Sequence, residues 1–247
     1  SDVYKRQLLA VGLCWTGEHM LRWALAALAW GVLGNGGTLA LNSAFDRDEG
    51  DIGYLESPPP VPRGLGGFAA ALLVVGVPIA GLVGPRFAAV YVVCAVLSVL
   101  YSVPPFRFKA RAGLDVLTNA SGYGALTAYA GWVAADGALS PPIVNVVLAF
   151  FCFFVGFYPL TQIYQFAEDL QRGDRTLALS LGKTNALRVG VAGVVAGFSF
   201  LAVEVLQRYR GMRAVGLLLG VVAWMAVLVP WYVRRGEVDV QYEKRRF

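Results

Sequence analysis

Long apolar runs separated by short polar segments make up most of the chain. Each run is about 20 residues long, which is the length that an α-helix needs to cross ~30 Å of hydrocarbon. The runs stay apolar on both faces, which argues against the alternating strands of a membrane barrel and favours helices that satisfy their own backbone. The pattern predicts about seven full spans, near residues 21–41, 65–83, 87–103, 113–134, 142–164, 185–206 and 214–233.

Composition agrees with this pattern. Of the 247 residues, 57% are hydrophobic and 15% are charged, and the mean hydropathy is +0.59. A soluble domain of this length carries more charge and less apolar surface. We therefore predict an all-α, polytopic transmembrane bundle that forms a single domain over residues 8–247.

The two ends of the chain differ from the rest. Residues 1–7, SDVYKRQ, resemble translated sequencing-adapter sequence, so we treat them as non-native and leave them out of the fold. Residues 8–15 are apolar but too short to span a membrane, and residues 241–247 are charged and stop where another helix could begin. We expect a chain that is cut within its first and last helices.

Cysteine and histidine are too sparse for several kinds of chemistry. Cys14, Cys94 and Cys152 lie singly in apolar runs, which predicts neither a zinc site nor a disulfide framework. His19 is the only histidine, so histidine metal sites are excluded and a catalytic triad is disfavoured. The net charge of +5 comes from basic residues between the apolar runs, which indicates topology and no nucleic-acid partner.

Most Lys and Arg residues lie in alternate loops, which predicts one cytoplasmic side by the positive-inside rule. These loops are residues 42–64, 104–112, 165–183 and 234–247. We expect an integral protein of a bacterial inner membrane, with its acidic segments on the cytoplasmic side.

The most polar segment is NSAFDRDEGD, residues 42–51, at the end of an apolar run. Asn42 and Asp46 are one helical turn apart and therefore share a helix face. Gly50 permits a turn that would bring Asp51 back beside Asp46. A plain solvated loop is the alternative to a binding site here.

A second polar segment, QIYQFAEDLQRGDRT, covers residues 162–176 and follows another apolar run on the same predicted side. Gln165 and Asp169 repeat the one-turn spacing. The offset from Asn42 to Gln165 equals the offset from Asp46 to Asp169, which hints at a parallel internal repeat.

Two acidic clusters at one membrane face favour a hard cation such as Mg²⁺, because carboxylate and amide oxygens are its usual protein ligands. Carboxylates near lipid are costly unless they are paired, which favours a functional role. The candidate metal ligands are Asn42, Asp46, Asp51, Gln165, Glu168 and Asp169. Mg²⁺ leaves positions for phosphate oxygens, and nearby cations would neutralise a diphosphate. The candidates for that contact are Arg63, Arg107, Lys109, Arg175 and Lys183.

The segment YSVPPFRFKARAGLD, residues 101–115, lies between two predicted spans. Its two prolines predict an extended chain, on which alternate basic residues cannot all face one ligand. We favour Arg107 and Lys109 for the diphosphate and interpret Arg111 as a positive-inside anchor. Asp115 and Asn119 are one turn apart at the start of the next helix, where they would touch an acceptor or a metal. The alternative for Asp115 is a partner of the helix dipole.

These motifs resemble those of the UbiA superfamily of intramembrane prenyltransferases. The first family signature is matched by Asn42, Asp46 and Asp51, and the second by the carboxylates of residues 165–169 followed by GDRT. The third is the YSVPP segment with its basic loop. Three departures are Ser43 where the family often has Asp, one extra residue between Asp46 and Asp51, and Gln165 in place of the first Asp of the second motif.

The resemblance implies a bundle of nine helices with a lateral cavity and Mg²⁺ as cofactor. It further implies that Mg²⁺ and basic side chains stabilise the leaving diphosphate of an isoprenoid substrate, and that a lipophilic acceptor captures the allylic cation. An aromatic quinone precursor is the expected acceptor, and membrane lipid surrounds the protein. Asp46, Asp169 and Asp115 would be catalytic. Contact with the prenyl chain or the acceptor would fall to Asn119, Tyr101, Tyr123 and Tyr164, although packing or interfacial anchoring also explains each tyrosine.

A transporter of an anionic or cation-coupled substrate is the leading alternative. It would place polar groups near the middle of its spans, or would use broken helices. A CDP-alcohol phosphotransferase is disfavoured because its DGxxAR signature is absent from the sequence. The acidic segments at one predicted face favour the prenyltransferase.

Overall fold

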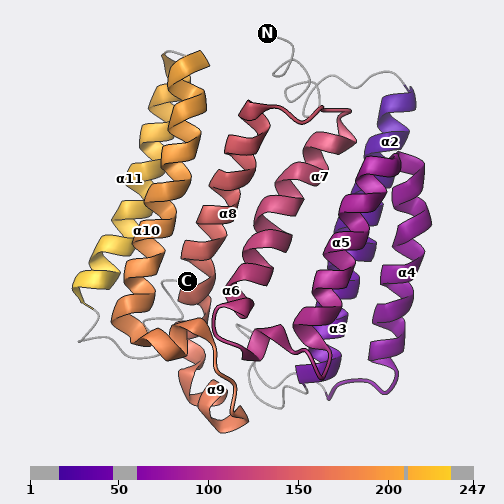
Figure 1. Ribbon diagram of the computed structural model, residues 1–247, viewed down its shortest axis with the longest axis horizontal. Helices are drawn as coiled ribbons and strands as arrows, with labels where there is room; N and C mark the ends of the chain where they lie inside the picture. Colours follow the sequence, from indigo (N-terminus) through magenta and orange to yellow (C-terminus); the bar gives the residue numbers. More distant parts are fainter. Residues whose placement is uncertain (1–16, 47–59, 209–210, 235–247) are drawn as a thin grey trace. The chain divides into compact units, whose positions relative to one another are not determined.

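The computed structural model describes residues 17–46, 60–208 and 211–234, and the regular elements in these ranges are all helices (Figure 1). The helices in chain order are α2 (Gly17–Ala27), a π-helical stretch (Leu28–Asn35), α3 (Gly36–Asp46), α4 (Leu65–Val83), α5 (Pro85–Ser102), α6 (Leu114–Asn119), a second π-helical stretch (Ala120–Leu126), α7 (Thr127–Ala134), α8 (Pro141–Gln162), α9 (Phe166–Arg172), α10 (Leu177–Arg208) and α11 (Met212–Val233).

Six helices in the described ranges are long and apolar enough to cross a membrane. They are Met20–Asp46, Leu65–Val83, Pro85–Ser102, Pro141–Arg172, Leu177–Gln207 and Met212–Val233. The predicted all-α membrane fold is therefore confirmed, and each of these helices corresponds to one predicted apolar run, to within one residue at the end of Pro85–Ser102. The remaining predicted run, residues 113–134, is divided between α6, the second π-helical stretch and α7. The interpretations of residues 1–7, 8–15 and 241–247 lie outside the described residues.

The chain forms two compact units. Unit 1 is drawn from residues up to 106 together with residues 129–139, and it contains the helices α2 to α5. Its helices α4 and α5 approach closely at Gly76, where any added Cβ atom would overlap the ring of Tyr91. The Tyr91 hydroxyl donates to the Leu73 carbonyl at 3.1 Å. This hydrogen bond lies in an apolar setting and fixes the register of α4 against α5.

Unit 2 is drawn from residues 107–128 and from residue 140 onward, and it contains α6 and α8 to α11. Figure 1 shows α8, α10 and α11 side by side in this unit. Helices α8 and α10 meet through glycines, because a Cβ at Gly193 would lie within 2.5 Å of backbone atoms of Gly156. Small residues of this kind let membrane helices pack backbone against backbone.

Helix α10 is bent at Gly182, whose φ of 74° and ψ of 159° are not helical. A φ in this range favours glycine because other residues carry a Cβ atom. The bend separates the first turn of α10, which follows the second acidic segment, from the longer apolar part. The predicted apolar run begins at residue 185, just beyond this bend.

Candidate functional site

The first motif lies in unit 1 at the end of α3. Asn42 and Asp46 are both within this helix, as their one-turn spacing predicts, and Asp46 is its last residue. The Ser102 hydroxyl, fully buried at the end of α5, donates to Asn42 Oδ1 at 3.4 Å. Asp51 lies outside the described residues. The described residues of the motif thus offer one carboxylate and one amide at a helix terminus.

The second motif lies in unit 2 and is built differently. Gln165 ends a short 3₁₀ turn (Ile163–Gln165), whereas Glu168 and Asp169 lie in the first turn of α9. The repeat suggested by equal offsets therefore does not extend to local structure, because the first motif is continuous α-helix. Asp169 is only 5% exposed, and it accepts a hydrogen bond from the Thr176 hydroxyl at 3.2 Å.

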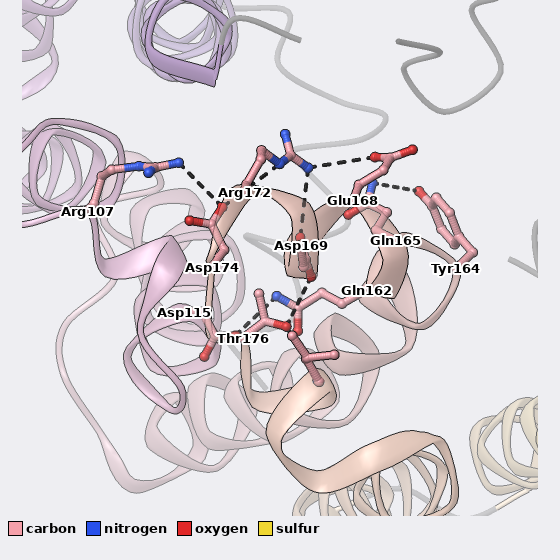
Figure 2. Close-up of polar contacts among 11 residues, drawn as sticks. Arg107, Asp115, Gln162, Tyr164, Gln165, Glu168, Asp169, Arg172, Asp174 and Thr176 are labelled. Atoms are coloured by element: carbon pink, nitrogen blue, oxygen red, sulfur yellow. Dashed lines mark hydrogen bonds and ion pairs between the residues drawn. The ribbon is translucent and has the colours of Figure 1, made fainter. Parts of the chain in front are cut away.

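Three carboxylates of this motif share one guanidinium group, as Figure 2 shows. The Nη2 atom of Arg172 is 3.6 Å from Glu168 Oε2 and 3.8 Å from Asp169 Oδ1. Its Nε atom is 4.0 Å from Asp174 Oδ2. Arg172 was not predicted as a site residue. It lies four residues after Glu168 and three residues after Asp169, and this spacing on a helix indicates the ion pairs.

The basic loop, residues 107–111, turns back on itself instead of extending. Arg107 has a left-handed φ of 37°, and a 3₁₀ turn (Phe108–Ala110) follows it. The prediction of an extended segment is therefore wrong, because the left-handed residue reverses the chain directly after the two prolines. The basic side chains therefore do not alternate as they would on a strand, and their order in the sequence does not show which of them share a ligand. Lys109 is buried on this turn.

The basic loop and the second motif are joined within unit 2. The Arg175 amide donates to the Ala110 carbonyl at 3.1 Å, and Arg111 and Arg175 form an isolated parallel bridge. Beside this bridge, Arg107 Nη2 is 3.4 Å from Asp174 Oδ2 (Figure 2). Segments separated along the chain by α6, α7 and α8 thus bring basic and acidic side chains together.

Asp115 is the most deeply buried acidic side chain of the site, at 0% exposure. Its Oδ2 atom accepts from the Leu177 amide at 2.7 Å and from Gln162 Nε2 at 3.1 Å. Leu177 is the first residue of α10, so Asp115 supports the N-terminus of that helix. Asp115 Oδ1 and Gln162 Oε1 are both buried without a hydrogen-bond partner. Such oxygen atoms call for a donor, which a ligand can supply.

Gln162 belongs to this network, although the sequence did not predict it as a site residue. It is buried at the end of α8. A buried amide at the end of an apolar helix needs partners for both its donor and its acceptor. Its position three residues before Gln165 was the available signal.

The other predicted residues are placed less centrally. Asn119 is buried, and its amide donates to the backbone carbonyl of Asp115 at 3.0 Å. Tyr123 stacks on Phe154 with ring centroids 6.3 Å apart, and Tyr164 accepts from Gln165 Nε2 at 3.4 Å. The remaining predicted site residues are half-buried or exposed. Tyr101 and Arg63 lie in unit 1, and Arg175 and Lys183 lie in unit 2.

The oxygen donors present fit a magnesium ion. Gln165, Glu168 and Asp169 supply amide and carboxylate oxygens, which Mg²⁺ prefers to nitrogen or sulfur. Among the described residues, no group of three or more His, Cys, Asp and Glu side chains is arranged to hold a metal. Mg²⁺ needs no such cage, because it is commonly held by one or two carboxylates together with water and substrate phosphate.

Two features bear on the transporter alternative. In unit 2, Asn145 Nδ2 donates to Glu204 Oε1 at 2.7 Å. Asn145 lies near the start of α8 and Glu204 near the end of α10, so this polar pair is not at mid-span. The run from residue 114 to 134 changes to π-helical geometry over Ala120–Leu126 and stays helical throughout.

A cavity of about 320 Å³ lies in unit 2 between α8 and α11. Its walls are apolar and aromatic. They are formed by Phe157, Leu160, Ala223, Trp224, Val227, Leu228 and Trp231.

Comparison with known proteins separates the alternatives. The sequence model of the UbiA prenyltransferase family matches residues 8–246. The lycopene elongase/hydratase of Haloferax volcanii is 34% identical over 109 residues, which are 44% of this chain and 35% of that protein. This chain thus matches about a third of the length of that relative.

Solved structures share the fold. A UbiA homolog from Archaeoglobus fulgidus bound to GPP and Mg²⁺ has a TM-score of 0.75 at 20% identity, covering 91% of this chain and 82% of that chain. The same homolog bound to DMAPP and Mg²⁺ has a TM-score of 0.74 at 18% identity, covering 89% and 78%. A digeranylgeranylglyceryl phosphate synthase has a TM-score of 0.66 at 16% identity, covering 92% and 80%.

Proposed function

This chain belongs to the UbiA prenyltransferase family, and from that premise we propose that it transfers a polyprenyl group from an isoprenoid diphosphate to a lipophilic acceptor after Mg²⁺-assisted ionisation. The single observation that carries this proposal is the junction of the basic loop with the second motif. There a buried carboxylate for a metal and cations for a diphosphate lie on two segments held together by the hydrogen bond from the Arg175 amide to the Ala110 carbonyl.

Mg²⁺, when bound, would withdraw electron density from the diphosphate oxygens and so weaken the allylic C–O bond. Gln165, Glu168 and Asp169 would hold it in unit 2. Asn42, Asp46 and Asp51, the candidate ligands of the first motif, would likewise bind Mg²⁺ through their oxygens. Arg172 already balances the charge of the second motif. We expect its guanidinium to turn from these carboxylates toward the diphosphate when the metal binds.

Basic side chains would bind the leaving group. Arg107 and Lys109 lie on the basic loop and Arg175 lies on the adjoining segment, so they supply positive charge from one region of unit 2. Asp174 holds the guanidinium of Arg107 in place. Lys183 would add to this charge from α10 of the same unit, and Arg63 is a further candidate for diphosphate contact in unit 1. Charge that develops on the diphosphate as the C–O bond breaks is stabilised by such fixed cations.

Asp115 would act on the acceptor. Its Oδ2 atom is occupied by Leu177 and Gln162, whereas Oδ1 is buried without a partner. When the acceptor captures the allylic cation through carbon, the adduct must lose a proton, and Oδ1 would receive it. Asn119 supports the Asp115 backbone. Tyr101, Tyr123 and Tyr164 would contact the prenyl chain or the acceptor.

An aromatic quinone precursor is the acceptor that we propose first. The relative named lycopene elongase/hydratase supports a second candidate, a polyene hydrocarbon. Both acceptors form a carbon–carbon bond with the cation and then release a proton, so the same residues serve either reaction. We place the reaction on the cytoplasmic side of a bacterial inner membrane.

A direct experiment distinguishes these proposals. Membranes that contain the protein would be incubated with Mg²⁺ and labelled geranylgeranyl diphosphate, together with either a hydroxybenzoate-type aromatic or lycopene. Mass spectrometry would then identify the lipid product. A prenylated aromatic product supports the first acceptor and an elongated polyene supports the second. If neither forms while a known family member tested in parallel is active, the proposed function is wrong.

A further inference from the structure

We infer that Arg188, in the first half of α10, binds the phosphate of an anionic membrane lipid whose acyl chain lies along the exposed face of the same helix. The site uses none of the residues assigned above to the metal, the diphosphate or the acceptor. It therefore does not depend on the proposed prenyl transfer.

Arg188 is a charged residue within a helix that can cross a membrane. It is the only basic residue in the predicted apolar run 185–206, and it lies in the candidate span Leu177–Gln207. Gln207 follows it by 19 residues, which corresponds to roughly 28 Å along a helix axis. This length is close to the ~30 Å of hydrocarbon in a bilayer. With Gln207 at one membrane boundary, Arg188 lies at the depth of the lipid headgroups of the other.

Two neutral side chains hold the guanidinium of Arg188. Its Nε atom donates to the Tyr232 hydroxyl at 3.3 Å, and its Nη1 atom donates to Asn185 Oδ1 at 3.0 Å. Asn185 is itself fixed, because its Nδ2 atom donates to the Leu181 carbonyl at 3.1 Å. These contacts come from α10 and α11, which both belong to unit 2. The guanidinium is therefore oriented, but its charge is not neutralised.

The charge of Arg188 has no acidic partner in the part of the chain that the structure describes. None of the Asp and Glu residues there forms an ion pair with it, and its Nη2 atom has no hydrogen-bond partner there. Arg22, Arg107 and Arg172, by contrast, each pair with a carboxylate. A charge beside hydrocarbon is costly unless it is paired. Because the side chain of Arg188 is exposed, a lipid phosphate can supply the missing partner through the N–H donors of the guanidinium.

The exposed face of α10 beyond Arg188 suits an acyl chain. Ala192, Val195 and Ser199 follow Arg188 at intervals of four, three and four residues, and all three are exposed. This spacing places them on the same side of the helix as Arg188. The Ser199 hydroxyl donates to the Val195 carbonyl at 2.8 Å, which satisfies its donor within the helix. A chain that lies against these small side chains would bring its headgroup to Arg188.

The charge of the site favours an anionic lipid over a zwitterionic one. A zwitterionic headgroup carries a cation beside its phosphate, and the described residues offer no carboxylate paired with Arg188 that could receive that cation. A headgroup with net negative charge has no such requirement, and a basic residue at the membrane surface attracts it.

The test compares lipids that have the same dioleoyl chains. Binding of phosphatidylglycerol, phosphatidylcholine and diacylglycerol to the purified full chain in detergent would be measured by native mass spectrometry. We expect phosphatidylglycerol to bind at least about fivefold more tightly than the other two lipids. Arg188→Gln should weaken phosphatidylglycerol binding about tenfold and change diacylglycerol binding less than about twofold.

Three further variants separate an oriented guanidinium from charge alone. Arg188→Lys keeps the charge and loses the planar group that Tyr232 and Asn185 hold, so it should weaken phosphatidylglycerol binding about threefold. Tyr232→Phe removes only the acceptor of Nε and should have an effect of about the same size. Arg213→Gln is the matched control, because it removes one exposed positive charge from the opposite end of α11. It should change phosphatidylglycerol binding less than about twofold.

Other outcomes overturn the inference. If Arg188→Gln and Arg213→Gln weaken phosphatidylglycerol binding equally, net charge alone attracts the lipid. Should Arg188→Gln fail to fold, Tyr232→Phe decides, and an unchanged affinity in that variant contradicts the site. If millimolar inorganic phosphate or GPP displaces phosphatidylglycerol from the unaltered protein, Arg188 binds a soluble anion or the substrate, and the assignment to a membrane lipid is wrong.

Discussion

The two acidic motifs have related sequences but different surroundings. In unit 1, Asn42 and Asp46 lie on one turn of a continuous helix, Asp46 is half-buried, and the Ser102 hydroxyl donates to Asn42. In unit 2, Asp169 is buried, hydrogen-bonded to Thr176 and paired with Arg172. Motifs with the same spacing therefore differ in backbone geometry and in the burial of their carboxylates. We conclude that the second motif holds Asp169 in a buried network before any ligand binds.

The largest effect should come from removing a carboxylate. Asp169→Ala and Asp46→Ala should each lower Mg²⁺-dependent prenyl transfer by roughly 100-fold or more, because each removes an expected metal ligand. Initial rates with labelled diphosphate would measure this loss. Asp169→Ala should also lower the free energy of unfolding, because it breaks the buried contacts with Thr176 and Arg172. Asp46→Ala should lower it less, because Asp46 is only half-buried. Retained activity in either variant would remove that residue from the metal site.

Asp115 provides the next largest effect, and it concerns folding as well as activity. Asp115→Ala leaves the Leu177 amide and Gln162 Nε2 without their acceptor, which should cost about 2–4 kcal/mol of stability. Chemical unfolding in detergent would measure it. Asn42→Ala is the control from unit 1, since Asn42 is only half-buried and accepts from Ser102 over a long distance of 3.4 Å. An equal effect of both substitutions would contradict the supporting role of the Asp115 network.

The membrane helices and the family could be predicted from the sequence, because both depend on local features. Apolar runs of bilayer length predict spans without knowledge of neighbours, and the signatures are short and ordered along the chain. The arrangement of the site could not be predicted in this way. The turn at Arg107, the Asp115–Gln162 contact and the hydrogen bond from Arg188 to Tyr232 all depend on which segments meet in the folded protein.

The wrong prediction of an extended basic loop has the same origin. Two consecutive prolines restrict their own φ angles and disfavour helix in the residue before each of them. They do not constrain Arg107, which adopts a left-handed φ. Its guanidinium is 3.4 Å from Asp174, a residue that is distant in the sequence. Local propensity thus missed the turn over residues 103–106, which the hydrogen bond from the Phe106 amide to the Val103 carbonyl closes, as well as the reversal at Arg107.

A smaller effect should distinguish the arginines of the two units. Arg107→Gln should raise the KM for the isoprenoid diphosphate about tenfold, because Asp174 fixes Arg107 in place. Arg63→Gln, at an exposed position in unit 1, should raise it no more than about threefold. Steady-state kinetics at saturating acceptor would measure both values. The reverse order would show that the first unit supplies the main diphosphate contact.

The smallest expected effect concerns the departure of Gln165 from the family pattern. Gln165→Asp adds a charged oxygen ligand to the second motif and should lower the Mg²⁺ concentration for half-maximal activity about threefold. Gln162→Glu is a useful comparison, because that side chain contacts Asp115 and is not an expected metal ligand. An unchanged or higher Mg²⁺ requirement in Gln165→Asp would show that Gln165 does not limit coordination.

The hydrogen bond from the Arg175 amide to the Ala110 carbonyl links the basic loop to the segment that follows α9. If the proposed metal binding shifts the end of α9, we expect the basic loop to move with it. A fluorophore on the basic loop would then respond to Mg²⁺ at the second motif without being attached to that motif. An inhibitor that breaks this hydrogen bond should weaken the proposed metal binding and the proposed diphosphate binding together.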